Sequence, residues 1–300
     1  SRTWAVIGPT LYEVNTSTGA LTSRGAITND GGIAYMASNG RGGEQLAICA
    51  GGQLKILTLT TNVLSAAIAL PLTAAPVTVV FLDGYFLLLE LNTIKVWFSA
   101  LENGSSWGAL DFFARSQTSD NLVGMIALRG RLWLFGTQTS EVFYNSGDAT
   151  TPFVPYPGSL MHEGLISAAA VTVQNESVYW MAQDNQGKHR FVEASDYAPT
   201  VVSTPAIGFA LTAFDATANA EAFAYEQEGH AFVGWSFPST TSFMLHGVGT
   251  TVGSSLVYDV NEKAWHQRST WVPGLAYEDR WAVRGMVNTD NGIVVGDSGT

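Results

Sequence analysis

The sequence predicts an all-β protein, a six-bladed β-propeller built from four-stranded antiparallel blades. One pattern recurs along the chain: an apolar strand, a tight polar turn, and a second strand rich in aromatic residues. The turns at Gly40, Gly84, Gly130 and Asn175 follow one another at intervals of 44, 46 and 45 residues. Self-similarity at this period is typical of propeller blades, each of which is a small four-stranded sheet. Seven blades stay open as an alternative count.

The blades are expected in order along the chain. Residues 1–28 lack one strand of a blade, and residues 281–300 can supply it, so the two ends are predicted to share the first blade. This pairing of N- and C-terminal strands would close the ring and remove free sheet edges. The other five blades are expected at residues 31–70, 77–116, 121–163, 166–207 and 220–272.

We expect residues 1–300 to form a single domain, because the repeat is even from end to end. The chain starts without Met in strand-like sequence and stops just after an apolar run, so we expect a fragment of a longer chain.

The third blade illustrates the assignment of strands. Residues 77–82 and 85–90 are continuous apolar runs, as expected for strands covered on both faces, whereas 94–100 and 109–114 alternate like outer strands. Asp83-Gly84 supplies the positive φ of a tight hairpin turn. In the sixth blade, Met244–Ser255 is predicted to be an exposed loop or an extra hairpin. No stretch shows a sustained helical period, so helical content should be close to nil.

Composition limits the function. The chain has 14 Lys and Arg against 25 Asp and Glu, a net charge of −11, and no basic run. DNA gripping needs clustered cations, so this role is disfavoured, whereas a wall past which DNA slides is compatible with the charge. The single Cys49 lies in an apolar strand and is predicted to be a small buried residue. No apolar stretch approaches the roughly 20 residues that span a bilayer, so no membrane insertion is expected.

Three local motifs are interpreted as structural. Ala100–Trp107 nearly matches the Asp-box, a turn between the outer strands of sialidase-like blades, and is predicted to be a folding device. Gly296–Gly299 has the GDSG letters of trypsin-like nucleophile loops, but a turn after a strand is the simpler interpretation. The glycines of 247–253 lack dinucleotide-binding spacing and predict a flexible loop.

No catalytic, cofactor-binding or metal site is predicted, and no cofactor is expected. No histidine stands at metal-ligand spacing from another His or Cys; the five are His162, His189, His230, His246 and His266. The acidic pairs Glu226/Glu228 and Glu278/Asp279 are predicted to be solvated turns, with glycosidase carboxylates as the alternative.

Several segments resemble a known family. They are FLDGYF (81–86), FSALENGSSWGALDFF (98–113), SDNLVGM (119–125), LRGRLWLFGTQTSEVFYNSGD (128–148) and TPF (151–153). They are similar to the packaged-DNA stabilisation family, the tail-hub or tail accessory proteins of short-tailed (podovirus) bacteriophages. The resemblance implies a structural virion protein, not an enzyme, with the propeller fold of related nozzle proteins.

The resemblance also implies partners. Family members assemble in the bacterial host cytoplasm into a ring, commonly a hexamer, in the virion tail below the portal and its head–tail adaptor. The ring extends the channel for double-stranded DNA, helps to retain packaged DNA, and offers attachment to the tail needle or tail spikes.

Two other functions stay open from the residues alone. A carbohydrate-binding or glycoside-hydrolysing propeller would need convergent carboxylates or an arginine cluster at one end of its channel. The arginines are scattered, several beside turns, such as Arg41, Arg129 and Arg131. A general interaction scaffold of a bacterial or viral surface is the third possibility.

Overall fold

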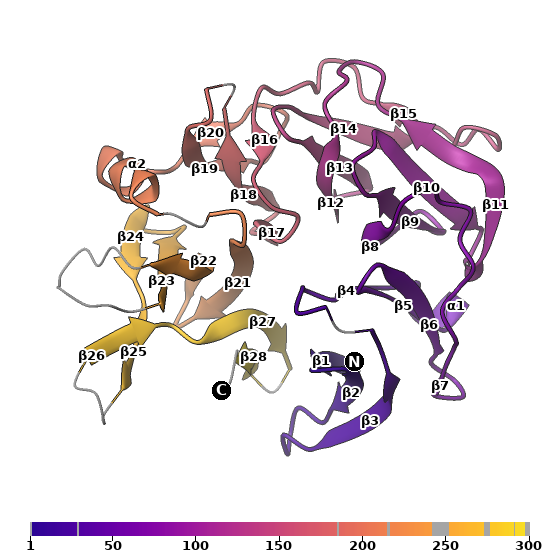
Figure 1. Cartoon of the computed structure of the whole chain (residues 1–300), viewed down its shortest axis with the longest axis horizontal. Helices are drawn as coiled ribbons and strands as arrows, with labels where there is room; N and C mark the ends of the chain where they lie inside the picture. The colour runs from indigo at the N-terminus through magenta and orange to yellow at the C-terminus, as the bar shows by residue number, and fades with distance from the viewer. Residues whose placement is uncertain are drawn as a thin grey trace. The chain divides into compact units, whose positions relative to one another are not determined.

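The fold is an all-β propeller of six blades, as the repeat predicted (Figure 1). The computed structural model describes residues 2–28, 30–184, 186–214, 217–241, 252–272, 277–290 and 292–297. The chain divides into two compact units. The first contains Ser1–Gly136 and Ser140–Leu160, and the second contains Thr137–Thr139 and Met161–Thr300. That all 300 residues form a single domain stays a prediction.

The first unit holds four antiparallel sheets in chain order, coloured indigo to magenta in Figure 1. The first sheet has three strands, β1-β2-β3, and the next three have four strands each. The elements are β1 (Thr3–Ile7), β2 (Thr10–Val14), β3 (Leu21–Ala26), β4 (Tyr35–Ser38), α1 (Gly40–Gly43), β5 (Gln45–Ala50), β6 (Gln53–Thr58), β7 (Val63–Leu64), β8 (Pro76–Leu82), β9 (Tyr85–Glu90), β10 (Lys95–Ala100), β11 (Asn103–Ala114), β12 (Leu122–Leu128), β13 (Arg131–Gly136), β14 (Ser140–Asn145) and β15 (Phe153–Pro155).

Strand β9 shows how one blade packs on two neighbours. Its side chains alternate between faces, because the strand has a period of two. Leu87 and Leu89 join a core with Leu132 of the fourth blade, whereas Phe86 and Leu88 join a second core with residues of the second blade. Each of these side chains is fully buried, and burying one contributes about 1.5–3 kcal/mol. Apolar residues are therefore required at each position from Phe86 to Leu89 of this strand.

The second unit holds the fifth and sixth blades and two hairpins. Both β16 and β17 pair with β18, so two short strands share the inner position of the fifth blade. The elements are β16 (Gly164–Leu165), β17 (Val171–Gln174), β18 (Ser177–Gln183), β19 (His189–Ala194), β20 (Thr200–Val201), α2 (Pro205–Thr212), β21 (Glu221–Gln227), β22 (His230–Thr241), β23 (Val252–Asp259), β24 (Ala264–Gln267), β25 (Ser269–Val272), β26 (Tyr277–Arg280), β27 (Val283–Thr289) and β28 (Gly292–Asp297).

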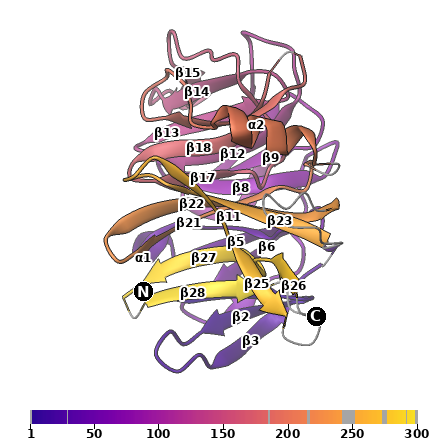
Figure 2. The same cartoon turned by 90° about the vertical axis from the view of Figure 1, so that its left-hand side faces the viewer.

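The predicted closure of the ring through hydrogen-bonded terminal strands is wrong. β1 pairs with β2 and β27 pairs with β28, and in the described ranges no ladder joins the two ends of the chain. Figure 2 shows β27 and β28 as a hairpin of their own. The reason is that β27 packs by its side chains beside β21: Val283 shares a core with Phe223, and Arg284 forms an ion pair with Glu221.

Helical content is low but exceeds the expectation of almost none. Helix α2 lies in the connection between the fifth and sixth blades, where Thr204 Oγ1 accepts a hydrogen bond from the Ile207 N–H and Pro205 opens the first turn. Of the predicted insertion Met244–Ser255, Met244–Thr251 lie outside the described residues and Val252–Ser255 belong to β23. In the part of the chain that the structure describes, no helix is long and apolar enough to cross a membrane.

Candidate functional site

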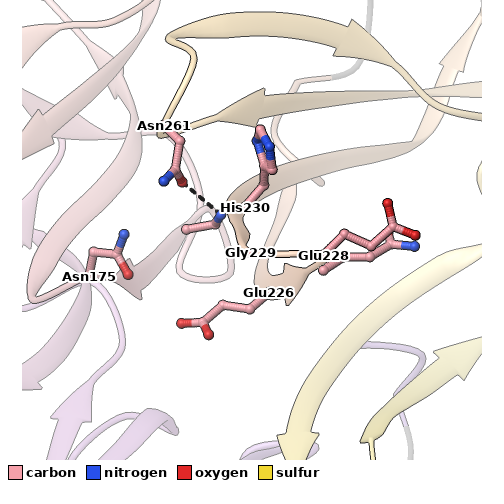
Figure 3. Close-up of a pocket in the computed structure, with 8 residues that line it drawn as sticks. Asn175, Glu226, Glu228, Gly229, His230 and Asn261 are labelled. Atoms are coloured by element: carbon pink, nitrogen blue, oxygen red, sulfur yellow. Dashed lines mark hydrogen bonds between the residues drawn. The ribbon is translucent and has the colours of Figure 1, made fainter.

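A small polar pocket lies in the second unit, where three hairpin turns meet (Figure 3). The turns belong to the β17–β18, β21–β22 and β23–β24 hairpins. The pocket has a volume of about 280 Å³ and is lined by Asn175, Glu226, Gln227, Glu228, Gly229, His230, Ala231 and Asn261. Of the predicted candidates, it brings together His230, Glu226 and Glu228.

His230 belongs to a group of polar contacts that connects two of these turns. Its Nδ1 lies 2.7 Å from Oδ2 of Asp259, whose other oxygen accepts the backbone N–H groups of Asn261 and Glu262. Burial tends to raise the pKa of Asp259, but these hydrogen bonds outweigh it and hold the pKa below its usual value. Asn261 Oδ1 accepts the Ala231 N–H at 2.9 Å (Figure 3). The arrangement therefore fastens the β21–β22 turn to the β23–β24 turn.

The two carboxylates of the pocket do not converge. Glu226 accepts a hydrogen bond from Gln174 Nε2 at 3.2 Å, and the Glu228 side chain points away from that of Glu226 (Figure 3). Both are exposed, as predicted for a solvated turn. Glycoside hydrolysis needs two carboxyl groups facing one bond, so this pair does not fit it. The side chains of Glu278 and Asp279 lie outside the described residues.

The other described histidines, His162, His189 and His266, do not line the pocket. His162 and His266 are exposed, and burial lowers the pKa of His189. His246 and residues 247–251 lie outside the described residues, whereas Val252 and Gly253 belong to β23. Among the residues that the structure describes, no three His, Cys, Asp or Glu side chains are grouped to hold a metal ion.

The Asp-box-like segment is a structural turn. Trp107 Nε1 donates to the Gly104 carbonyl at 2.8 Å, and the Gly104 N–H donates to Gln45 of the second blade. Asn103 Oδ1 accepts a hydrogen bond from the turn amide of Ser105 at 3.0 Å. The segment therefore joins the third blade to the second. In the GDSG motif, Gly296 and Asp297 end β28, and 298–300 lie outside the described residues.

Cys49 is buried, as predicted, and burial raises the pKa of its thiol to about 12. The thiolate is the reactive form of cysteine, so this side chain is chemically inert.

Several cationic side chains contact other parts of the fold. Among the described residues, several arginines pair with carboxylates: Arg2 and Arg24 with Glu13, Arg115 with Asp120 and Glu141, Arg190 with Glu163, and Arg284 with Glu221. Arg131 lies over the rings of Tyr144 and Tyr156, and Lys95 over that of Phe112. These cations contact carboxylates or aromatic rings of the same chain, which is typical of a structural role.

The Arg115 cluster lies in the connection between the third and fourth blades. Arg115 follows β11, Asp120 precedes β12, and Glu141 lies in β14. Arg115 Nη1 is 2.9 Å from Asp120 Oδ1, and Arg115 Nε donates to Glu141 Oε1. The side chains of Arg115 and Glu141 are fully buried. The sequence offered no signal for this cluster, since Glu141 lies 26 residues from Arg115 and in another blade.

Comparison with known proteins assigns the chain to a family. The whole chain, residues 1–300, matches the phage stabilisation model described as "Bacteriophage P22 Gp10, beta-propeller". The chain belongs to this phage stabilisation family. It is therefore a structural protein of a phage tail, a component of the virion that assembles with other virion proteins. The family suggests a role other than catalysis, which agrees with the divergent carboxylates of the pocket.

A comparison with curated protein sequences gives no match to this chain. Among solved structures, the chain is similar to one from "Crystal Structure of Mitotic Checkpoint Complex", with a TM-score of 0.56 and 10% sequence identity. The similarity covers 98% of this chain and 83% of the other, and it concerns the fold alone.

Proposed function

We propose that this protein is a hub or nozzle subunit that lies below the portal and head–tail adaptor of a short-tailed phage. The observation that carries the proposal is the match to the phage stabilisation family over residues 1–300. Subunits form a ring, which we propose to be a hexamer. The ring forms part of the wall of the DNA channel, helps to retain packaged DNA, and attaches the tail needle or tail spikes. The chain is assembled into tails in the host cytoplasm and performs no catalysis.

DNA passes along the axis of the ring of subunits in this proposal. The major groove of B-form DNA alone is about 12 Å wide, so a duplex is too broad for the hole of one six-bladed propeller. Each propeller therefore contributes a part of the wall around the duplex.

The charge of the chain supports a channel wall that binds passing DNA only weakly. Affinity for a duplex comes largely from Lys and Arg that contact phosphates and release counterions. The net charge here is −11, and arginines such as Arg115, Arg190 and Arg284 are already paired with carboxylates. With this acidic balance, we expect the channel wall to bind phosphates weakly, so that DNA slides past it during ejection.

The proposal is tested with DNA-filled heads that carry portal and adaptor but no tail. We expect the purified protein to co-sediment with these heads and to slow the loss of their DNA. Heads without the adaptor are the control, and they should not bind it. Free duplex DNA should show no retention by the protein even at low salt. Failure to bind adaptor-bearing heads, or binding or cleavage of glycans by the purified protein, would contradict the proposal.

A further inference from the structure

The outermost strand of the third blade displays an apolar bulge. β11 is the edge strand of its sheet, and its pairing with β10 jumps from Trp97–Phe112 to Ser99–Trp107. Residues 108–111 therefore face a single residue of β10, and such bulges turn side chains away from the ladder. Leu110 lies in this bulge and is 84% exposed, the highest value of any large apolar side chain in the described ranges. Residues 103–114 contain one charged side chain, Asp111.

A second apolar surface lies at the outer edge of the fifth blade. β20 is the edge strand there, and α2 follows it and packs beside β19 (Figure 1). Residues 197–214 contain no charged side chain. Helix α2 buries Ile207, Ala210 and Leu211 against the blade, yet Phe209 on its outer side is 67% exposed. A helix that is apolar on all sides is typical of one covered on all sides, so the outer side of α2 is expected to be covered in the assembly.

The two surfaces have the properties of two halves of one contact. A ring is built from heterologous contacts, which need two different surfaces on every copy. The core of a protein interface is depleted of charge and enriched in aromatic side chains. The Leu110 bulge and the outer side of α2 meet these conditions on a chain of net charge −11, whose acidic surfaces repel one another. Each surface also lies at the outer edge of its blade, where it is open to a second copy.

We infer that the Leu110 bulge of one copy packs against the outer side of α2, around Phe209, of the next copy. The inference rests on the proposed ring and names the contact that builds it.

Charge insertion tests the contact. Leu110→Glu and Phe209→Glu should each convert rings to monomers in native mass spectrometry, with unchanged circular dichroism, because both side chains are exposed. Val63→Glu is the matched control, since Val63 is 61% exposed on the edge strand β7 of another blade, and this variant should still form rings. Rings that persist in Leu110→Glu or Phe209→Glu would overturn the inference.

Cross-linking tests the pairing of the two surfaces. The double variant Leu110→Cys/Phe209→Cys, treated with a short bis-maleimide, should give a ladder of linked copies up to the ring size. Each single variant should give no ladder, because a heterologous contact does not bring a residue against its own copy. Cys49 is buried and does not compete. A wild-type ring with no ladder would overturn the contact and leave the proposed function intact, whereas a wild-type chain that stays monomeric would overturn both.

Discussion

Replacement of Arg115 by methionine tests the account of the buried charges. Arg115 and Glu141 have no solvent-exposed side-chain surface, and Asp120 is 14% exposed. The change Arg115→Met keeps much of the side-chain volume and removes the charge. It leaves the Glu141 carboxylate buried with no counter-charge from Arg115, while Glu141 Oε2 already lacks a hydrogen-bond partner.

The expected cost follows from this burial. Breaking a buried ion pair by removal of one partner costs about 3–5 kcal/mol, because the other charge stays desolvated. For a compact unit of this size, that loss lowers the melting temperature by about 6 to 20 °C. Thermal and urea unfolding, followed by tryptophan fluorescence, measures this loss of stability. If two unfolding transitions are seen, the earlier one is compared between the two proteins.

Two further variants make the test specific. Arg24→Met breaks the partly exposed pair with Glu13 and should cost less than about 1 kcal/mol. The double variant Arg115→Met/Glu141→Leu should recover most of the lost stability, since no fully buried charge remains in this cluster. The reasoning fails if Arg115→Met costs no more than Arg24→Met, or if the double variant is no more stable than Arg115→Met.

Two other substitutions and one labelling experiment have defined outcomes. Glu90→Gln should lower the free energy of unfolding by about 1–3 kcal/mol at pH 7, because Glu90 accepts hydrogen bonds from Thr73, Ala74 and Trp97. Burial tends to raise the pKa of Glu90, but these hydrogen bonds outweigh it and lower the pKa. The stabilisation by Glu90 is therefore present above about pH 4.5 and is lost as the pH falls through the lowered pKa. Equal stability of the wild-type protein and Glu90→Gln at pH 7 would refute this. Gly136→Ala should destabilise the fold in urea unfolding, because a Cβ there would collide with Asp120 and Arg115; a neutral effect would show that the cluster has room to move. Cys49 should react with a thiol reagent only after unfolding, and fast labelling of the native protein would contradict its burial.

The hairpins could be predicted because their signals are local. The turn at Asp83-Gly84 has φ values of 49° and 86°, as an Asp-Gly hairpin turn requires. The apolar run Phe86–Leu89 predicted a strand covered on both faces, and the structure shows the two cores that cover it. Repetition of this local pattern was sufficient to predict the blades.

Closure could not be predicted because it depends on which edges pair. The hairpin β27–β28 has the same sequence features as any other hairpin of the chain, and nothing local specifies its partner. Its position beside β21 depends on Arg284 and Glu221, which are 63 residues apart. Helix α2 did leave a signal, since Thr204-Pro205 is a typical helix start, but an eight-residue helix is too short to show a sustained period.

The pocket was missed for a related reason. His230 and the acidic pair Glu226/Glu228 were noted as separate features, and the amides of Asn175 and Asn261 that line the pocket with them come from other hairpins. Polar residues in turns are common, and only the packing of neighbouring blades brings these turns together.

An electron cryo-microscopy reconstruction of the mature tail tests the central claim most directly. The account predicts a ring of six-bladed propellers directly below the portal and adaptor, surrounding the DNA, with a channel surface from this chain that is acidic or neutral. A channel surface lined by clusters of Lys and Arg from this chain, or a position of the chain away from the DNA path, would contradict it.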